Sequence, residues 1–227
     1  MWDVAASSRV DYFIGISKAV VKRIEKFYRR EAALIYPPVD VSRFQPSAKL
    51  EDYFLLVSRL IPYKRVDIVV HAFNALGLPL VVIGDGRDRP VLEALADGNI
   101  KFLGRVSDDE LRDRVACCRA FIFPGEEDFG IAPLEAQAAG RPVIALAAGG
   151  ALETVLDGKT GKFFYSQTPE ALAEAVRGFD QTNFDIKAIV EHAKAFGTDL
   201  FKEQLQRYIE EKAEEHRRNF LLTQSGL

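Results

Sequence analysis

Two charged groups in this 227-residue sequence have the residue types and spacing to bind a phosphorylated ligand, and the first of them is basic. Arg59 lies at the carboxyl end of an apolar run that we expect to be a strand, and we expect Lys64 to start the next helix. The carboxyl edge of an open α/β sheet is where ligands bind. An Arg fork and a Lys point charge at that edge suit a diphosphate, with about 1.5–3 kcal/mol for each charged hydrogen bond. Taken alone, the pair is more often a solvated turn.

The second group is acidic and lies in a segment that links an expected strand to an expected helix. Glu127 belongs to a run of three acids, and Glu135 follows eight residues later, in what we expect to be the first helical turn because Pro133 favours that position. Carboxylates accept hydrogen bonds from hydroxyls, while backbone N–H groups around Gly130 and Ile131 can hold an anion. The segment therefore suits a polyhydroxylated ligand that carries phosphate. The alternative is that Glu135 complements a helix dipole and the acidic loop keeps the surface soluble.

Short apolar runs alternate with stretches of helical spacing through the middle of the chain, and this alternation must position both groups. We expect strands at 53–57, 80–83, 100–103, 120–123 and 142–145, and helices at 66–73, 90–95 and 107–115. Ser107 followed by Glu110 is a capping box. The pattern predicts an α/β fold with a Rossmann-like, doubly wound parallel sheet and additional C-terminal helices.

The sequence divides into three expected parts. Residues 1–50 are expected to be a lead-in helix and linker, 51–197 the Rossmann-like domain, and 198–227 an amphipathic helix and tail. Further helices are expected at 17–30, 169–178 and 185–195. The last helix carries an apolar stripe that needs a partner surface, formed by Phe201, Leu205, Tyr208 and Ile209.

Composition excludes several classes of function. A net charge of −3 offers no basic field for nucleic acid, and 48% hydrophobic residues are enough for a globular core. The two cysteines are adjacent and cannot form a disulfide framework, which is typical of a reducing compartment. Apolar runs stop far short of the roughly 20 residues that span a bilayer, and no secretory signal is seen. We expect a cytoplasmic protein, with His71, His192 and His216 in structural or surface roles rather than as metal ligands.

The helix expected at 17–30 is the most basic part of the chain. It holds six basic residues against one acid. Such a helix could make peripheral contact with the inner face of an anionic membrane. A solvated helix face is the interpretation that we favour.

Joined in order, the two charged groups resemble the donor-binding half of a retaining glycosyltransferase of the GT-B fold, family 4. The resemblance covers residues from about 10 to 215, and its spacing is more specific than any single piece. Further matches are Pro37-Pro38-Val39-Asp40, Val82-Ile83-Gly84-Asp85-Gly86, Phe102-Leu103-Gly104, Pro142-Val143-Ile144 and Gly149-Gly150-Ala151. The Gly84-x-Gly86 pair lacks the third glycine of a dinucleotide fingerprint, because position 89 is Arg, so we expect a tight turn there.

The resemblance implies a role for each candidate residue. Arg59 and Lys64 would bind the donor diphosphate and stabilise the leaving phosphate, and Glu127 would meet the donor sugar; these three form the expected catalytic group. Glu135 would bind the ribose, and Arg105 and Val106 would line the base pocket. The remaining expected donor-binding residues are Gly84, Phe129, Gly130 and Ile131. No cofactor and no metal are expected, since two basic residues can neutralise the phosphate and the site loops hold no Asp-x-Asp pair.

The same resemblance gives expectations about substrates and partners. The loop from Glu126 to Ile131 looks most like mannosyltransferases that use GDP-mannose, and the acceptor would be a saccharide or a lipid-linked sugar. The family's N-terminal Rossmann-like domain, which carries the acceptor site, has no counterpart here, so we expect an incomplete catalytic unit. The alternatives are a UDP-sugar transferase, a phosphorylase of the same fold, and a non-enzymatic module that binds a nucleotide or a protein.

Overall fold

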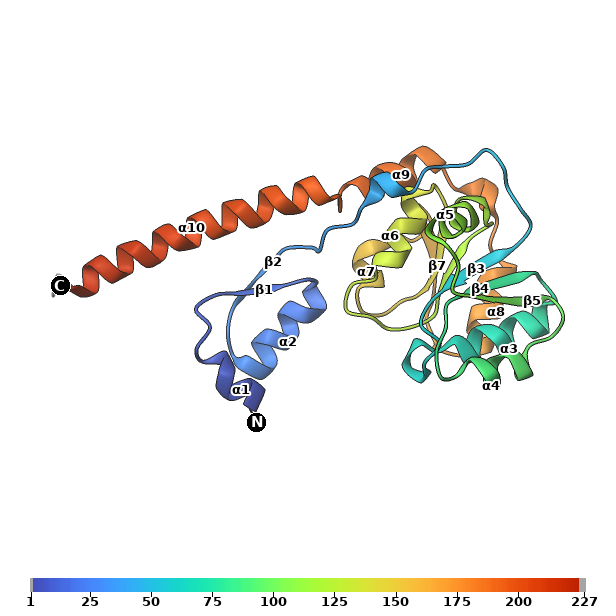
Figure 1. Ribbon diagram of the computed structural model, residues 1–227, viewed down its shortest axis with the longest axis horizontal. Helices are drawn as coiled ribbons and strands as arrows, with labels where there is room; N and C mark the ends of the chain where they lie inside the picture. The colour runs from blue at the N-terminus through green and yellow to red at the C-terminus, as the bar shows by residue number, and fades with distance from the viewer. Residues whose placement is uncertain (1, 225–227) are drawn as a thin grey trace. The chain divides into compact units, whose positions relative to one another are not determined.

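The computed structural model describes residues 2–224, with side chains for residues 3–219; the end of the expected tail, 225–227, lies outside this range. The chain forms two compact units (Figure 1). The larger is Val39–Ala195, and the smaller combines Met1–Pro38 with Phe196–Leu227. The larger unit thus begins at residue 39 instead of the expected 51 and ends at residue 195 instead of the expected 197. The first and last segments, expected as separate parts, belong to one unit.

The larger unit is built on a six-stranded parallel sheet, which confirms the expected Rossmann-like fold class. Its order is β5-β4-β3-β6-β7-β8. The strands are β3 (Phe54–Val57), β4 (Leu80–Ile83), β5 (Ile100–Gly104), β6 (Phe121–Phe123), β7 (Val143–Leu146) and β8 (Gly161–Phe164). Five match the expected strands within two residues. The sixth, β8, was not expected, because Gly161 and Lys162 leave only a two-residue apolar run.

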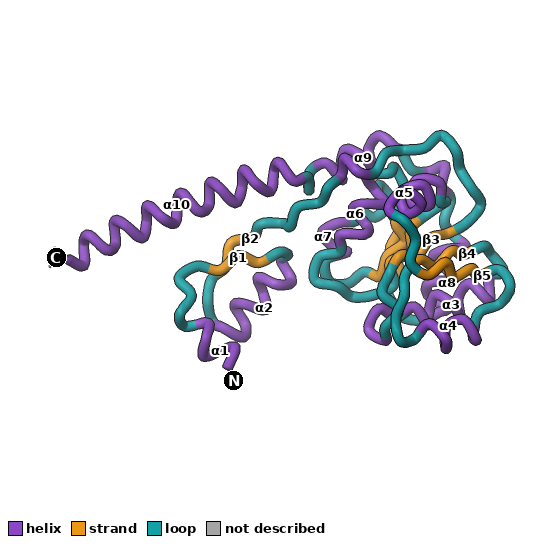
Figure 2. Tube along the Cα trace, in the orientation of Figure 1, coloured by secondary structure: helices purple, strands orange, loops and turns teal. Residues whose placement is uncertain are grey.

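Helices cover both faces of this sheet, with the strands between them (Figures 1 and 2). One hydrophobic cluster joins the sheet to α3 (Val66–Leu76), α4 (Arg89–Leu95) and α8 (Pro169–Arg177). The other joins it to α5 (Asp108–Cys117), α6 (Ile131–Ala138), α7 (Ala151–Thr154) and α9 (Ile186–Lys194). Short 3-10 turns are η1 (Val41–Arg43), η2 (Pro62–Lys64) and η3 (Gln181–Asn183). Because both faces are covered, the strands can be apolar throughout.

The strand order reverses at the centre of the sheet, between β3 and β6. Counted along the chain, the order is 3-2-1-4-5-6, in which the first and fourth strands are neighbours. The helix after β3 lies on one face and the helix after β6 lies on the other. The two connections therefore part at the carboxyl ends of these strands, which is the switch point where open α/β sheets bind ligands.

The Gly84-x-Gly86 segment follows β4, and its glycines permit close approach of two backbones. Gly84 has a φ of 129°, and a Cβ built on it would lie 1.8 Å from the carbonyl oxygen of Ser58. A Cβ on Gly86 would lie 2.2 Å from the carbonyl oxygen of Leu60. These glycines hold the segment that follows β3 against the end of β4, and the turn itself lies just after them, at residues 87 and 88.

The smaller unit is a β-α-β unit with two more helices. Strands β1 (Phe13–Gly15) and β2 (Ala32–Leu34) pair in parallel, and α2 (Lys18–Tyr28) connects them. Ser17 caps the amino end of α2. The other two helices of this unit are α1 (Trp2–Ser7) and α10 (Thr198–Gln224). Neither strand was expected, because each is only three residues long.

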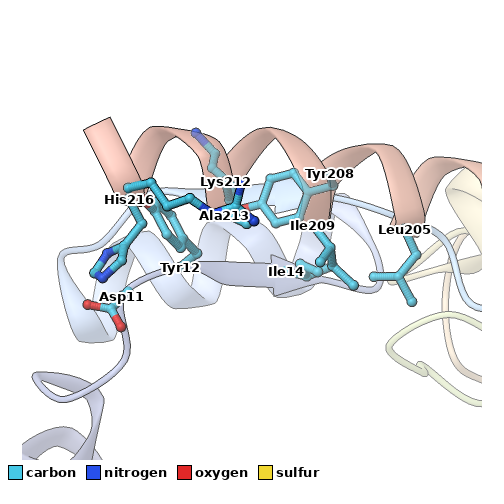
Figure 3. Close-up of a pocket in the computed structure, with 10 residues that line it drawn as sticks. Asp11, Tyr12, Ile14, Leu205, Tyr208, Ile209, Lys212, Ala213 and His216 are labelled. Carbon is cyan, nitrogen blue, oxygen red and sulfur yellow. The ribbon is translucent and has the colours of Figure 1, made fainter. Parts of the chain in front are cut away.

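An open groove of about 530 Å³ lies between α10 and the β1 segment (Figure 3). Leu205, Tyr208 and Ile209, from the expected apolar stripe, line it together with Tyr12 and Ile14. Ile209 is still 55% exposed. No helix within the described residues is long and apolar enough to cross a membrane.

Gly84→Ala should lower the free energy of unfolding by about 2 kcal/mol or more, because the new methyl meets a carbonyl oxygen and the backbone is strained. Urea denaturation measures the loss. Gly98→Ala is the matched control, since no atom lies within 4 Å of a Cβ there, and it should change stability by no more than about 0.5 kcal/mol. Equal stabilities for the two variants would contradict the close approach at Gly84.

Candidate functional site

The two basic candidates follow β3 at the switch point. Arg59 lies in the segment held by Gly84 and Gly86, and its side chain is exposed. Lys64 ends the 3-10 turn η2, and Arg65 then adopts a left-handed conformation with a φ of 53° before α3 begins at Val66. Lys64 thus lies in the turn that leads into the helix, rather than in the helix start as expected.

An ion pair brings the basic and acidic groups together. Lys64 Nζ lies 2.5 Å from Glu127 Oε1, and the two side chains are 15% and 25% exposed. Glu127 lies in the loop between β6 and α6, as expected. Residues that are 63 positions apart in the sequence therefore meet where β3 and β6 end. These two strands are the central pair of the six-stranded sheet.

The turn between β7 and α7 holds the acidic loop in place. The Gly150 N–H donates to the Glu127 carbonyl oxygen at 2.7 Å. Gly149 has a φ of 55°, and a Cβ on it would lie 2.3 Å from that same oxygen. A side chain at either glycine would push the loop outward, since a Cβ on Gly150 would meet Phe129 at 2.3 Å. The backbone of Glu127 is therefore positioned by the turn that follows β7, in addition to its own connection to β6.

Sequence reasoning missed two residues that support this arrangement. Gln167 donates from Nε2 to the Pro124 carbonyl oxygen at 3.1 Å, and it accepts a hydrogen bond from Arg65 Nη1 at 3.1 Å. Arg65 also donates to Asp67. This chain of contacts ties the start of the acidic loop to the residue next to Lys64. Gln167 is 102 residues from Arg65, and no local motif marks it.

The amino end of α6 supplies the expected backbone donors. Gly130 precedes the helix with a φ of 92°, and no side chain caps it, so an anion can accept from the first amides. Ile131 is exposed, whereas the Phe129 ring is buried. Phe129 can therefore offer only its backbone to a ligand in this conformation.

Glu135 is the fifth residue of α6, so it lies in the second turn and not in the first as expected. Its side chain is half-buried, and burial raises the pKa of its carboxyl. The nearby Arg43 acts against this rise in pKa and Asp40 adds to it. Arg43 is itself shared with Asp108, at 2.9 Å between Nη2 and Oδ2. Glu135 is thus a poorly solvated acceptor, which suits the hydroxyls of a ligand.

The remaining candidates lie at the same edge of the sheet, but the structure does not join them to the ion pair. Arg105 and Val106 follow β5, with Arg105 exposed and Val106 packed against the core. Gly84 follows β4. Within 2–224 no group of three or more His, Cys, Asp or Glu side chains could hold a metal ion. The roles of these residues, and the expectation that no metal is needed, stay predictions.

Glu135→Gln should stabilise the chain at neutral pH. Because the folded state raises this pKa, ionised Glu135 opposes folding above its ordinary pKa, and this cost disappears once the carboxyl is protonated. The variant's gain in unfolding free energy should therefore be present at about pH 7 and absent at about pH 4, measured by urea denaturation. The exposed Glu174→Gln, on α8, is the control. A gain that is the same at both pH values would rule out this explanation.

Comparison with known sequences gives the family. Residues 40–197 match the family described as "Glycosyl transferases group 1". An uncharacterised glycosyltransferase of Methanocaldococcus jannaschii is 28% identical over 196 residues, covering 84% of this chain and 56% of the relative. A GDP-mannose-dependent alpha-(1-6)-phosphatidylinositol monomannoside mannosyltransferase of Mycobacterium tuberculosis is 33% identical over 193 residues, covering 71% of this chain and 50% of the relative. The chain thus spans about half the length of these relatives.

Solved structures agree in fold. Sucrose-phosphate synthase from Thermosynechococcus elongatus matches with a TM-score of 0.84 at 20% identity, over 94% of this chain and 61% of that one. HepE of Anabaena, in complex with UDP-glucose, matches with a TM-score of 0.79 at 21% identity, over 92% of this chain and 66% of that one. The strand order, the switch-point charges and the sequence match over residues 40–197 lead to one conclusion: this chain belongs to the family of group 1 glycosyl transferases.

Proposed function

We propose that this chain binds a nucleotide-diphosphate sugar at its switch point and supplies the donor half of a retaining glycosyl transfer. The observation that carries the proposal is the Lys64–Glu127 pair, formed from the same segment after β3 that carries Arg59. Two cations and a carboxylate at the carboxyl ends of β3 and β6 match the mixed chemistry of such a donor, which is anionic at one end and rich in hydroxyls at the other. Family membership supports the assignment.

Each charged residue has a part in the proposed chemistry. Arg59 and Lys64 hold the diphosphate and stabilise the negative charge that grows on it as the sugar departs, which is electrostatic stabilisation of the transition state. The uncapped amino end of α6 adds backbone donors. Glu127 accepts from the sugar hydroxyls and Glu135 from the ribose. Two cations offset the charge of the leaving group, so no metal or other cofactor is needed.

The donor we propose is GDP-mannose. The acidic loop led to this expectation, and the support is that the mycobacterial relative is named as GDP-mannose-dependent. UDP-sugars are the alternative, because HepE was solved with UDP-glucose. The base pocket around Arg105 and Val106 would make this choice.

The acceptor side is proposed to lie on a further, N-terminal domain. Two features support this: the chain spans about half the length of these relatives, and within the described residues the smaller unit has a two-stranded parallel sheet. Parallel sheets are stable when they have more strands and are covered on both faces. In the smaller unit the apolar side chains of Val4, Ile14 and Phe27 are exposed, as expected if a further domain covers them. The acceptor would be a saccharide or lipid-linked sugar at the cytoplasmic side, in line with the lipid named for the mycobacterial relative.

Arg59→Ala and Lys64→Ala should each weaken binding of GDP, by up to about 3 kcal/mol, the scale of one charged contact. Calorimetric titration with GDP, UDP and ADP measures this and ranks the bases, with GDP expected to bind best. Lys101→Ala, an exposed lysine on β5, is the control and should bind as the unaltered chain does. If both site variants keep full affinity, the site is wrong; if no nucleotide binds, the non-enzymatic protein-binding alternative is favoured.

This chain alone should bind donor without transferring sugar at a useful rate. Holding donor and acceptor in one geometry contributes many orders of magnitude to rate, and the residues that position the acceptor are proposed to lie elsewhere. Transfer from GDP-mannose to a lipid-linked acceptor is measured with the chain alone and after adding the N-terminal domain of a relative. Robust transfer by the 227 residues alone would place the acceptor site within this chain and contradict the proposal.

A further inference from the structure

The Lys64–Glu127 ion pair joins two side chains that the proposed function assigns to different parts of the donor. Their charged atoms are 2.5 Å apart, and the side chains are 15% and 25% exposed. Charges at this distance and burial attract more strongly than on an open surface, because less water screens them. A diphosphate that binds Lys64 must therefore compete with Glu127.

The backbone on both sides of the pair is fixed, so any exchange of partners falls to the side chains. The Glu127 carbonyl oxygen accepts from Gly150, and Gly149 packs against it too closely for a Cβ. The Lys64 N–H donates to the Ile61 carbonyl oxygen at 3.1 Å. The flexible four-carbon stem of Lys64 lets its ammonium change partners while the loops stay in place.

Arg59 differs from Lys64, because no acidic side chain among the described residues pairs with it. Its side chain is exposed, and no ion pair to it is found in the part of the chain that the structure describes. A diphosphate can therefore bind Arg59 without displacing anything. Lys64 becomes its second anchor only after leaving Glu127.

We propose that donor binding exchanges the partners of this pair, so that Lys64 moves to the diphosphate while Glu127 accepts hydrogen bonds from the sugar hydroxyls. The inference rests on the proposed function and adds a specificity to it. An intact donor replaces both halves of the ion pair. A nucleoside diphosphate replaces only one half and leaves Glu127 facing the phosphates without a hydrogen-bond donor. This unfavourable contact makes the site distinguish donor from product, and Glu127 reclaims Lys64 as the product leaves.

The test is the Glu127→Gln variant, which keeps the shape of the side chain and removes its charge. It should bind GDP about tenfold more tightly than the unaltered chain, the scale of one charge-assisted contact. Its affinity for GDP-mannose should rise by a smaller factor or fall. The ratio of the GDP-mannose affinity to the GDP affinity should therefore be lower than in the unaltered chain. Glu126→Gln is the matched control: it removes one charge from the same loop at an exposed position and should leave both affinities unchanged.

A double-mutant cycle shows whether Glu127 acts through Lys64. In the Lys64→Ala background, Glu127→Gln should tighten GDP binding by at most about threefold, because only repulsion of the phosphates is then relieved. Equal gains in both backgrounds would overturn the exchange. It would also be overturned if the single variant Glu127→Gln bound GDP no more tightly than the unaltered chain while the single variant Lys64→Ala bound GDP more weakly. Unchanged GDP binding in both Arg59→Ala and Lys64→Ala would instead overturn the proposed site. Glu127→Ser serves as a second uncharged variant if Glu127→Gln fails to fold.

Discussion

The neighbouring position of β3 and β6 is the constraint on which the rest of the site depends. Because the strands are parallel and their connections part to opposite faces, the segments that follow them meet at one crevice. Basic residues follow one strand and acidic residues follow the other. Without this strand order, Lys64 and Glu127 would have no reason to meet. The fold thus brings opposite charges together through topology.

Close backbone approaches convert this topology into fixed geometry. Gly84 and Gly86 hold the segment that carries Arg59, while Gly149 and Gly150 hold the loop that carries Glu127. Glycine is required at these positions because a Cβ would overlap a backbone atom at each. The charged side chains are then the movable part of a rigid frame. Such a frame keeps the charged groups beside the ligand site, so that ligand binding requires only side-chain movements.

Much of the larger unit could be predicted from the sequence, because buried parallel strands are short apolar runs between turns and their helices carry caps such as Ser107. In the smaller unit α2 and α10 could be predicted from their helical spacing, but β1 and β2 could not, since they are three residues each. In the site, the identity of the charged residues came from local pattern and family resemblance. The ion pair between Lys64 and Glu127, and the supporting contact of Gln167, depend on chain segments far apart in sequence. Glu135 lies one turn later than expected because α6 already begins at Ile131, two residues before Pro133.

The central claim is that a nucleoside diphosphate binds where β3 and β6 end, and amide hydrogen exchange tests it most directly. Exchange is followed peptide by peptide with and without saturating GDP. The account predicts slower exchange in two separate segments, residues 58–65 and residues 125–135, since both would contact the ligand and lose freedom together. Slower exchange confined to the smaller unit, or to only one of the two segments, would contradict it.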